Sequence, residues 1–147
     1  MERLPSWLLT QTAAHAGRLV GDGFGAIGAR GYHYRLLTSL LGDGPASQAD
    51  LGRRTAIHLS DMVAALNELE KSGYVRRAPD PADRRRNIIS ITDAGVRRAA
   101  ELAERVSEIQ EALLAPLDED ERRQLTTLLA KLYEHHRAQG IPPLPSM

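Results

Sequence analysis

Apolar residues recur at the spacing of an α-helix in several parts of the chain. Residues 5–25 form the first such segment, which begins at a proline, and residues 32–41 form the second, which stops at a Gly-Asp-Gly-Pro run. Two longer segments follow Thr92 and the acidic residues 118–121, and the last of them ends at Gly140. Because apolar residues three or four positions apart share one face of a helix, each segment is predicted to be an amphipathic helix. Thr92 suits the N-cap of the third, and the acidic run suits the positive end of the fourth.

The stretch between residues 47 and 95 is organised differently. Ser47 and Asp50 have capping-box spacing, which predicts a short helix that turns at Thr55 and Ala56. A second helix is predicted to end at Gly73 in a left-handed cap. Its apolar stripe consists of Leu59, Met62, Val63, Leu66 and Leu69. Two β-prone runs follow, at residues 74–77 and 87–91, around a Pro/Asp turn with three arginines. Together these elements indicate a winged helix-turn-helix, an architecture that binds duplex DNA.

The composition narrows the choice of partners. The length of 147 residues fits one domain with a dimerisation appendage, and the 42% hydrophobic content supports a core. Aromatic residues make up only 4%, which argues against single-stranded nucleic acid bound on stacked aromatic side chains. The absence of cysteine excludes disulfides, thiolate metal sites and cysteine-based redox sensing. No apolar run is long enough to span a membrane and no leader pattern is present, so we expect a cytoplasmic protein without membrane contact.

The net charge of zero conceals an uneven distribution. Residues 30–99 hold 12 Lys and Arg against 8 Asp and Glu, whereas the remainder holds 7 against 11. The local charges are therefore +4 and −4, with the basic excess on the predicted DNA-binding module. Chance could produce a difference of this size, so it only supports the interpretation.

Other chemistries find little support in the sequence. Residues 23–28 match the dinucleotide pattern G-x-G-x-x-G, and Asp50 stands where an acidic partner is sought. That pattern requires a preceding strand, whereas the segment before it is predicted to be helical, so a glycine-weakened helix end is expected instead. The motifs of hydrolases, zinc peptidases and phosphate loops are absent, and the acidic pairs lie on charged helical faces, so no enzyme activity is expected. His135 and His136 are adjacent and diverge on a helix, so no metal site is expected.

Four motifs in the stretch resemble the MarR family of bacterial transcription regulators. Residues 80–86 (Asp-Pro-Ala-Asp-Arg-Arg-Arg) and 89–95 (Ile-Ser-Ile-Thr-Asp-Ala-Gly) are similar to the family's wing and the strand after it. Residues 66–75 resemble the end of its recognition helix, and residues 47–51 resemble the start of the supporting helix. Each motif alone is modest, but their order and spacing together are specific, and the resemblance covers nearly the whole chain.

The resemblance implies a mainly α (α+β) fold with a two-stranded wing. Residues 1–30 and 93–140 would form a helical dimerisation region, residues 31–92 the winged module, and residues 141–147 a tail. The amphipathic helices agree, since they carry more apolar surface than the module can cover, although packing as a monomeric bundle is the alternative. The family further implies a repressor that binds a pseudo-palindromic operator as a homodimer.

DNA contacts are expected from three groups of residues. The recognition helix would offer His58, Ser60, Asp61, Ala64 and Asn67 to the major groove, although Val63-Ala64 stands where many family members have Thr-Arg. The wing would reach the minor groove with Asp83 orienting Arg85, while Arg84 and Arg86 meet phosphates or brace the loop. Further phosphate contacts are expected from Ser47, Arg53, Arg54 and Lys71.

The resemblance also implies control by a small aromatic or phenolic effector, with no cofactor. Such a molecule would bind between the dimerisation helices and the winged module. The candidate lining residues are Trp7, His15, Tyr32, His33, Tyr34 and Arg35, of which Arg35 would pair with an anion. Ordinary packing is the alternative for each of them.

The weakly basic recognition helix also leaves open a second function, a winged-helix module that binds proteins rather than DNA. The three arginines at the tip of the wing argue against it.

Overall fold

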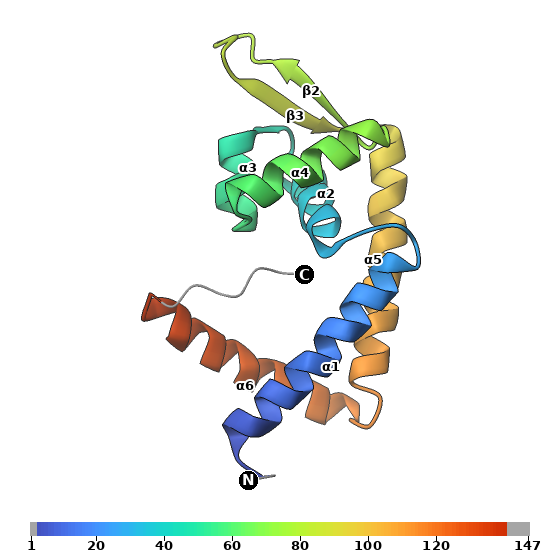
Figure 1. Ribbon diagram of the computed structural model, residues 1–147, viewed down its shortest axis with the longest axis vertical. Coiled ribbons are helices and arrows are strands. Elements are labelled where there is room, and N and C mark those ends of the chain that lie inside the picture. The colour runs from blue at the N-terminus through green and yellow to red at the C-terminus, as the bar shows by residue number, and fades with distance from the viewer. Residues whose placement is uncertain (1–2, 141–147) are drawn as a thin grey trace.

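The computed structural model describes residues 3–140, and the predicted tail at residues 141–147 lies outside them. The elements are α1 (Pro5–Gly25), α2 (Gly31–Asp43), β1 (Ala46–Ser47), α3 (Gln48–Thr55), α4 (Leu59–Lys71), β2 (Val75–Pro79), β3 (Asn87–Ile91), α5 (Asp93–Leu113) and α6 (Glu119–Ala138). The predicted helices and both wing strands are present within a few residues of their expected bounds (Figure 1). The fold is therefore mainly helical with a small antiparallel sheet, as expected.

The sheet contains one strand more than the sequence predicted. β2 and β3 form the antiparallel hairpin of the wing, with Val75 opposite Ile91 and Pro79 opposite Asn87. β1 adds to the other edge of β3, with Ala46 opposite Ile89, so the strand order is β1-β3-β2. This third strand ties the segment before α3 to the wing, and it holds the base of the hairpin against the helix-turn-helix.

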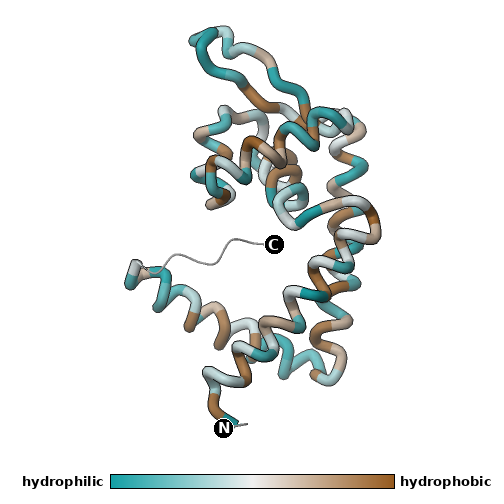
Figure 2. Tube along the Cα trace, in the orientation of Figure 1, coloured by the Kyte–Doolittle hydropathy of each residue, from teal (hydrophilic) through white to brown (hydrophobic). Residues whose placement is uncertain are grey.

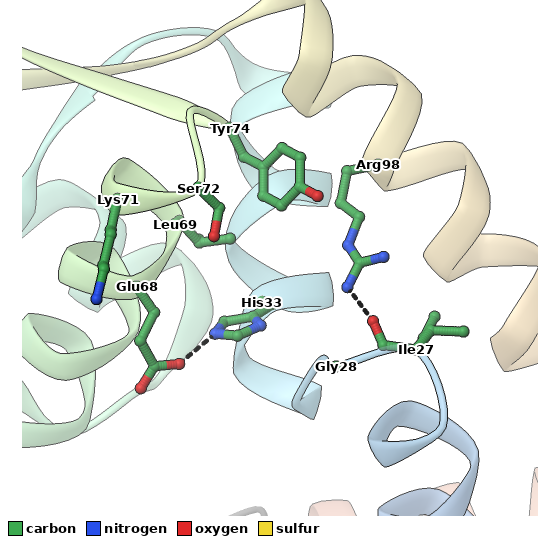
Figure 3. Close-up of a pocket in the computed structure, with 9 residues that line it drawn as sticks. All are labelled: Ile27, Gly28, His33, Glu68, Leu69, Lys71, Ser72, Tyr74 and Arg98. Carbon is green, nitrogen blue, oxygen red and sulfur yellow. Dashed lines mark hydrogen bonds and ion pairs between the residues drawn. The ribbon is translucent and has the colours of Figure 1, made fainter.

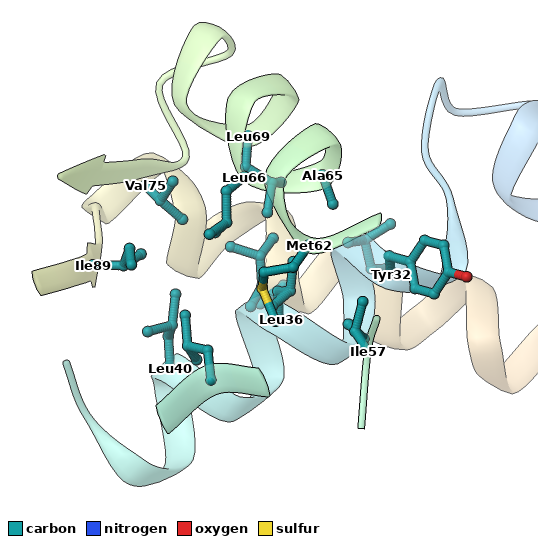
Figure 4. Packing of buried hydrophobic residues seen from close by; sticks show 14 of the residues in the cluster. Tyr32, Leu36, Leu40, Ile57, Met62, Ala65, Leu66, Leu69, Val75 and Ile89 are labelled. Carbon is teal, nitrogen blue, oxygen red and sulfur yellow. The ribbon is translucent and has the colours of Figure 1, made fainter. Parts of the chain in front are cut away.

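The core lies between the helix-turn-helix and the base of the wing (Figure 4). Leucines of α2 pack against the inner faces of α3 and α4, and Val75 and Ile89 close the core from the sheet. The largest side chains that are fully buried are Leu36, Leu37, Leu40, Leu51, Met62, Leu66, Leu69, Ile89 and Leu102. Burying each such side chain contributes about 1.5–3 kcal/mol, so α4 and the wing are held to one scaffold.

Three local predictions about turns and caps are confirmed. Gly73 ends α4 with a positive φ of 79°, and the Tyr74 amide donates to the Leu69 carbonyl across this cap. Thr92 caps α5, its hydroxyl accepting from the Gly95 amide at 3.0 Å. Ala56, between α3 and α4, adopts a left-handed φ of 53°, which makes the tight turn of the helix-turn-helix.

The glycine-rich run does not have the context of a dinucleotide site. α1 continues through Gly25, so a helix rather than a strand precedes the pattern, and the strands that the structure describes pair antiparallel. One of these glycines, Gly23, instead allows α1 to pack closely against α5. A Cβ on Gly23 would lie 2.7 Å from the Ile109 side chain of α5, so a larger residue there would require Ile109 to move.

The helices outside the winged module carry apolar side chains that the single chain leaves exposed. α6 extends away from the rest of the molecule, and apolar positions recur along it and at the start of α1 (Figure 2). The exposed side chains are Leu4, Trp7, Leu8 and Leu9 at the start of the chain and Leu128, Leu129, Leu132 and Tyr133 on α6. Within the part of the chain that the structure describes, no helix has the length and hydropathy needed to cross a bilayer.

Candidate nucleic-acid interface

The loop at the tip of the wing is closed by its own backbone. The Asp80 amide donates to the Arg86 carbonyl at 2.8 Å, and the Arg86 amide donates to the Asp83 carbonyl at 3.0 Å. The Asp80 carboxylate accepts from the Ala82 amide and lies 3.7 Å from the Arg86 guanidinium. These bonds place Arg84 and Arg85 at the turn, where both side chains are exposed.

Arg85 is held in place by Asp83. Its Nε donates to Asp83 Oδ1 at 3.0 Å, its Nη2 approaches Oδ2 at 3.3 Å, and its backbone amide donates to the same carboxylate. These bonds lower the pKa of Asp83, so the carboxylate is charged at neutral pH. The Arg85 side chain is nevertheless 91% exposed. An ion pair this exposed adds little stability. In this structure it aligns the Arg85 guanidinium with the Asp83 carboxylate and leaves the arginine accessible to a partner. The pair that the resemblance implied is present, and its contact with DNA stays a prediction.

The outer face of α4 differs from the predicted amphipathic pattern. Met62, Ala65, Leu66 and Leu69 are buried, whereas Leu59 is 68% exposed and Val63 is 39% exposed. The predicted stripe was therefore wrong at these two positions. At 3.6 residues per turn they lie at the edge of the buried face, so the core that covers Met62 and Leu66 leaves them exposed. His58, Ser60, Ala64 and Asn67 are exposed on this helix, as expected for residues that meet a groove.

Two of the predicted base-contacting residues already have partners within the protein. The Tyr32 hydroxyl donates to Asp61 at 3.3 Å, and burial followed by the Asp61 charge raises the pKa of Tyr32. Asp61 also lies in the first turn of α4, where a negative charge favours the helix. The Asn67 side-chain oxygen accepts from Arg77 at 2.8 Å. Arg77 was not among the predicted site residues, although Arg76 and Arg77 follow a few residues after α4 in the sequence.

The predicted phosphate contacts lie in different environments. Ser47 is buried and its hydroxyl accepts from the Asp50 amide, so we assign it the N-cap of α3 and omit it from the proposed contacts. Arg53 pairs with Asp50, and Arg54 donates to the Gly44 carbonyl at 3.2 Å; both side chains are exposed at the end of α3. Lys71 is exposed in the last turn of α4.

A cavity of about 450 Å³ lies where the winged module meets the other helices (Figure 3). It is bounded by the α1–α2 turn, by α2, by the end of α4 and by α5. The lining residues are Ile27, Gly28, His33, Glu68, Leu69, Lys71, Ser72, Tyr74 and Arg98. Glu68 joins α4 to α2, because His33 Nε2 lies 2.7 Å from its carboxylate and Arg30 donates to it at 2.7 Å. Arg98 of α5 donates to the Ile27 carbonyl and lies over the Tyr74 ring.

The six predicted effector residues do not form one pocket within a single chain. His33 lines the junction cavity, whereas Arg35 lines a separate one of about 350 Å³ with Tyr34 and Arg54. Tyr32 is buried in the core, and Trp7 and His15 are exposed on α1. Sequence reasoning overlooked Glu68 and Arg98, because their role depends on the approach of three helices that are distant in sequence.

His33 is expected to make the fold less stable in mild acid. Burial lowers the pKa of the His33 imidazole, and this outweighs the opposite effect of Glu68; Arg30 and Arg98 also favour the neutral ring. The unfolded chain therefore binds the proton first, and the free energy of unfolding falls as the pH drops below about 6.5. It levels off once the pH is below the lowered pKa. Urea unfolding at about pH 7.5 and about pH 5.5 measures this loss.

The variant His33→Gln provides the control for that measurement. Glutamine retains a hydrogen-bonding side chain toward Glu68 but does not titrate, so its loss of stability between the two pH values should be smaller. An equal loss in both proteins would show that another group is responsible.

The comparisons with known proteins agree on one family. A model of the MarR family matches residues 28–86. The transcriptional repressor NicR of Pseudomonas putida is 29% identical over 104 residues, which cover 71% of this chain and 66% of NicR. The matched part spans 48% to 66% of the length of the curated relatives.

Solved structures resemble the fold over most of its length. A probable transcriptional regulator from Pseudomonas aeruginosa shares 32% identity and a TM-score of 0.75, over 89% of this chain and 98% of that one. A mutant MarR from E. coli, in complex with operator DNA, has a TM-score of 0.73 at 21% identity, over 86% of this chain and 91% of that one. At this identity, the second match shows the fold.

Proposed function

Because the chain belongs to the MarR family, we propose that it represses transcription by binding a pseudo-palindromic operator in duplex DNA as a homodimer. The observation that carries this proposal is the arginine at the wing tip, which Asp83 orients while its side chain stays exposed. The solved complex of a structurally similar E. coli MarR with operator DNA supports the choice of partner. A regulator of this kind acts on the chromosome, so we place it in the cytoplasm.

The wing and α4 would share the contacts with the duplex. Arg85 would enter the minor groove, where a narrow groove has enhanced negative potential. The outer face of α4, with His58, Ser60, Ala64 and Asn67, would face the major groove next to it. Arg53, Arg54, Arg84 and Arg86 would contact phosphates, which set affinity and salt dependence rather than sequence preference.

The helices outside residues 31–92 would form the dimer. The exposed apolar side chains at the start of α1 and along α6 lie on the parts of the chain that the winged module does not cover. Apolar area of this extent favours a partner surface, and a two-fold partner is the simplest one. Two winged modules held in this way would match half-sites about one helical turn apart.

The junction cavity is the place that we propose for a small effector. Its walls come from α2, α4 and α5, so a bound molecule would change how the recognition helix sits on the dimer body. His33, Lys71 and Arg98 supply polar and positive groups for an anionic or phenolic compound. Such a molecule would alter DNA affinity only by binding one arrangement of the dimer better than the other.

A protein-binding winged helix is the second candidate. The observation that favours it is the exposed pair Leu59 and Val63 on α4, because apolar side chains of this size are frequent in protein interfaces. It predicts that the purified chain binds no duplex at low salt.

The test of the first candidate is duplex binding over a salt series, with Arg85→Ala beside the wild type. Wild-type affinity for duplex from the upstream region should fall steeply as salt rises. Arg85→Ala should lose about 1–3 kcal/mol of binding free energy, because a positioned contact is removed without changing the fold. Fluorescence anisotropy with labelled duplex measures both effects.

The matched control is Arg137→Ala. Arg137 is an exposed arginine paired with Glu134 on α6, so this variant removes the same charge and a similar ion pair far along the chain from the wing. If both variants lose equal affinity, only net charge matters and the wing assignment fails. If the wild type binds no duplex, including a pool of random sequences, the DNA-binding function is wrong.

A further inference from the structure

The first two turns of α4 present an apolar surface where a recognition helix meets base edges. Leu59 is 68% exposed and Val63 is 39% exposed, and the two lie four residues apart on one side of the helix. The N-terminal residues of such a helix are the ones that approach the bases most closely. Large apolar side chains that are exposed to water at these positions lower the solubility of the protein. Their exposure is therefore explained best by a partner surface that contains apolar groups.

Hydrogen-bonding chemistry is sparse on the same helix. From Leu59 to Glu70 the sequence contains no arginine and no lysine, so the usual bidentate partner of guanine is missing from these turns. Asp61 accepts from the Tyr32 hydroxyl, and the Asn67 oxygen accepts from Arg77. Two of the polar side chains that would otherwise contact bases are therefore already hydrogen-bonded within the protein.

Thymine offers the matching surface on DNA. Its C5-methyl group is the apolar feature that distinguishes it in the major groove, and it is contacted by apolar side chains. The positive charges on the elements before and after α4 favour a duplex over an apolar protein partner. Arg85 and Arg84 stand exposed at the tip of the wing that follows α4, and Arg53 is exposed at the end of the helix that precedes it.

We infer that Leu59 and Val63 determine sequence specificity by packing against the C5-methyl groups of thymines in each operator half-site. This inference rests on the proposed DNA-binding function and names what α4 recognises. It assigns the apolar side chains of the helix a direct contact, in place of the arginine contacts that the helix lacks.

The experiment replaces thymine by uracil in the best-bound duplex selected from a random pool. Uracil pairs like thymine and lacks only the major-groove methyl group, so the wing and the phosphate contacts meet unchanged partners. Each methyl group buried by α4 should be worth about fourfold in affinity, on the scale of one buried methylene. Replacing thymines one at a time, on both strands, should therefore locate a few sensitive positions in each half-site.

Protein variants connect those positions to the two side chains. Leu59→Ala and Val63→Ala should bind the thymine duplex more weakly and should lose the uracil effect at their own positions, as in a double-mutant cycle. Val96→Ala is the matched control, because Val96 on α5 has the same 39% exposure as Val63. It should retain the full uracil effect. All three positions are exposed, so circular dichroism should show unchanged folding.

The outcomes separate this inference from the function on which it rests. Tight binding of a duplex that tolerates uracil at every position would overturn the methyl contact and leave the regulator function intact. A uracil effect that persists in both α4 variants would also overturn it, because other residues would then contact the methyl groups. If no duplex is bound at all, the proposed function fails and the inference with it.

Discussion

The double variant Leu128→Glu/Leu132→Glu should be monomeric and should bind the operator at least about 100-fold more weakly than the wild type. The two leucines are four residues apart on α6, so they share one face, and both are exposed in the single chain. Two like charges placed in an apolar dimer interface would be desolvated without a partner. A monomer then binds one half-site at a time and loses the advantage of two linked contacts.

Sedimentation velocity measures the oligomeric state, and fluorescence anisotropy with the selected duplex measures the affinity. The matched control is Thr127→Glu/Ala130→Glu, which adds the same charge at exposed positions on the opposite face of α6. This control should remain a dimer with near wild-type affinity. If the leucine variant also remains a dimer, the apolar face of α6 is not the interface. If the wild type is itself monomeric, the proposed dimer is wrong, and the long helices pack within one chain, which is the alternative given in the sequence analysis.

Gly95→Ala should lower the free energy of unfolding by about 1–3 kcal/mol, the scale of an overpacked core position. A Cβ at this position would lie 2.1 Å from the Tyr74 carbonyl oxygen and 2.7 Å from the Ile91 side chain. The backbone there cannot easily move away. The Tyr74 carbonyl accepts from the Thr92 amide at 3.1 Å, and the Thr92 hydroxyl donates to the Gly73 carbonyl at 2.6 Å. These bonds fasten the end of β3 to the turn after α4.

Urea unfolding of the variant beside Gly52→Ala tests this close approach. Gly52 lies inside α3, and a Cβ there would meet nothing within 4 Å. Alanine in an open helical position should stabilise by about 0.5–1 kcal/mol, so the two glycines should respond with opposite signs. Equal effects would mean that helix propensity alone governs both positions and that the wing base tolerates a side chain.

The sequence located the helices because their signals are local. Pro5 marks the start of α1, Thr92 has the spacing of a cap for α5, and Gly73 takes the left-handed conformation that ends α4. Each signal acts through bonds within a few residues, so a single stretch contains all of the information. The wing tip is similar, since Asp83 and Arg85 are two residues apart and form their pair within one turn.

Contacts between distant segments were missed or misjudged. β1 is only two residues long, and it is a strand because Ala46 pairs with Ile89, far along the chain. The predicted apolar stripe of α4 included Leu59 and Val63 because both follow the helical spacing of its apolar residues. Helical spacing shows which side of a helix a residue lies on, but it does not show how far the core covers that side. The predicted effector residues also proved to lie in different places. His33 and Arg35 are close in sequence on α2, yet they line two different cavities.

The sequence by itself determined the order of elements, their caps and the basic tip of the wing, because periodicity and capping depend on residues close in the chain. The tertiary structure decided which polar groups stay available to a partner. Asp61 and Asn67 are committed to Tyr32 and Arg77, whereas Leu59 and Val63 stay exposed. Which side chains are bonded and which stay exposed depends on how closely α2 and β2 pack against α4. No local pattern along the chain determines that packing.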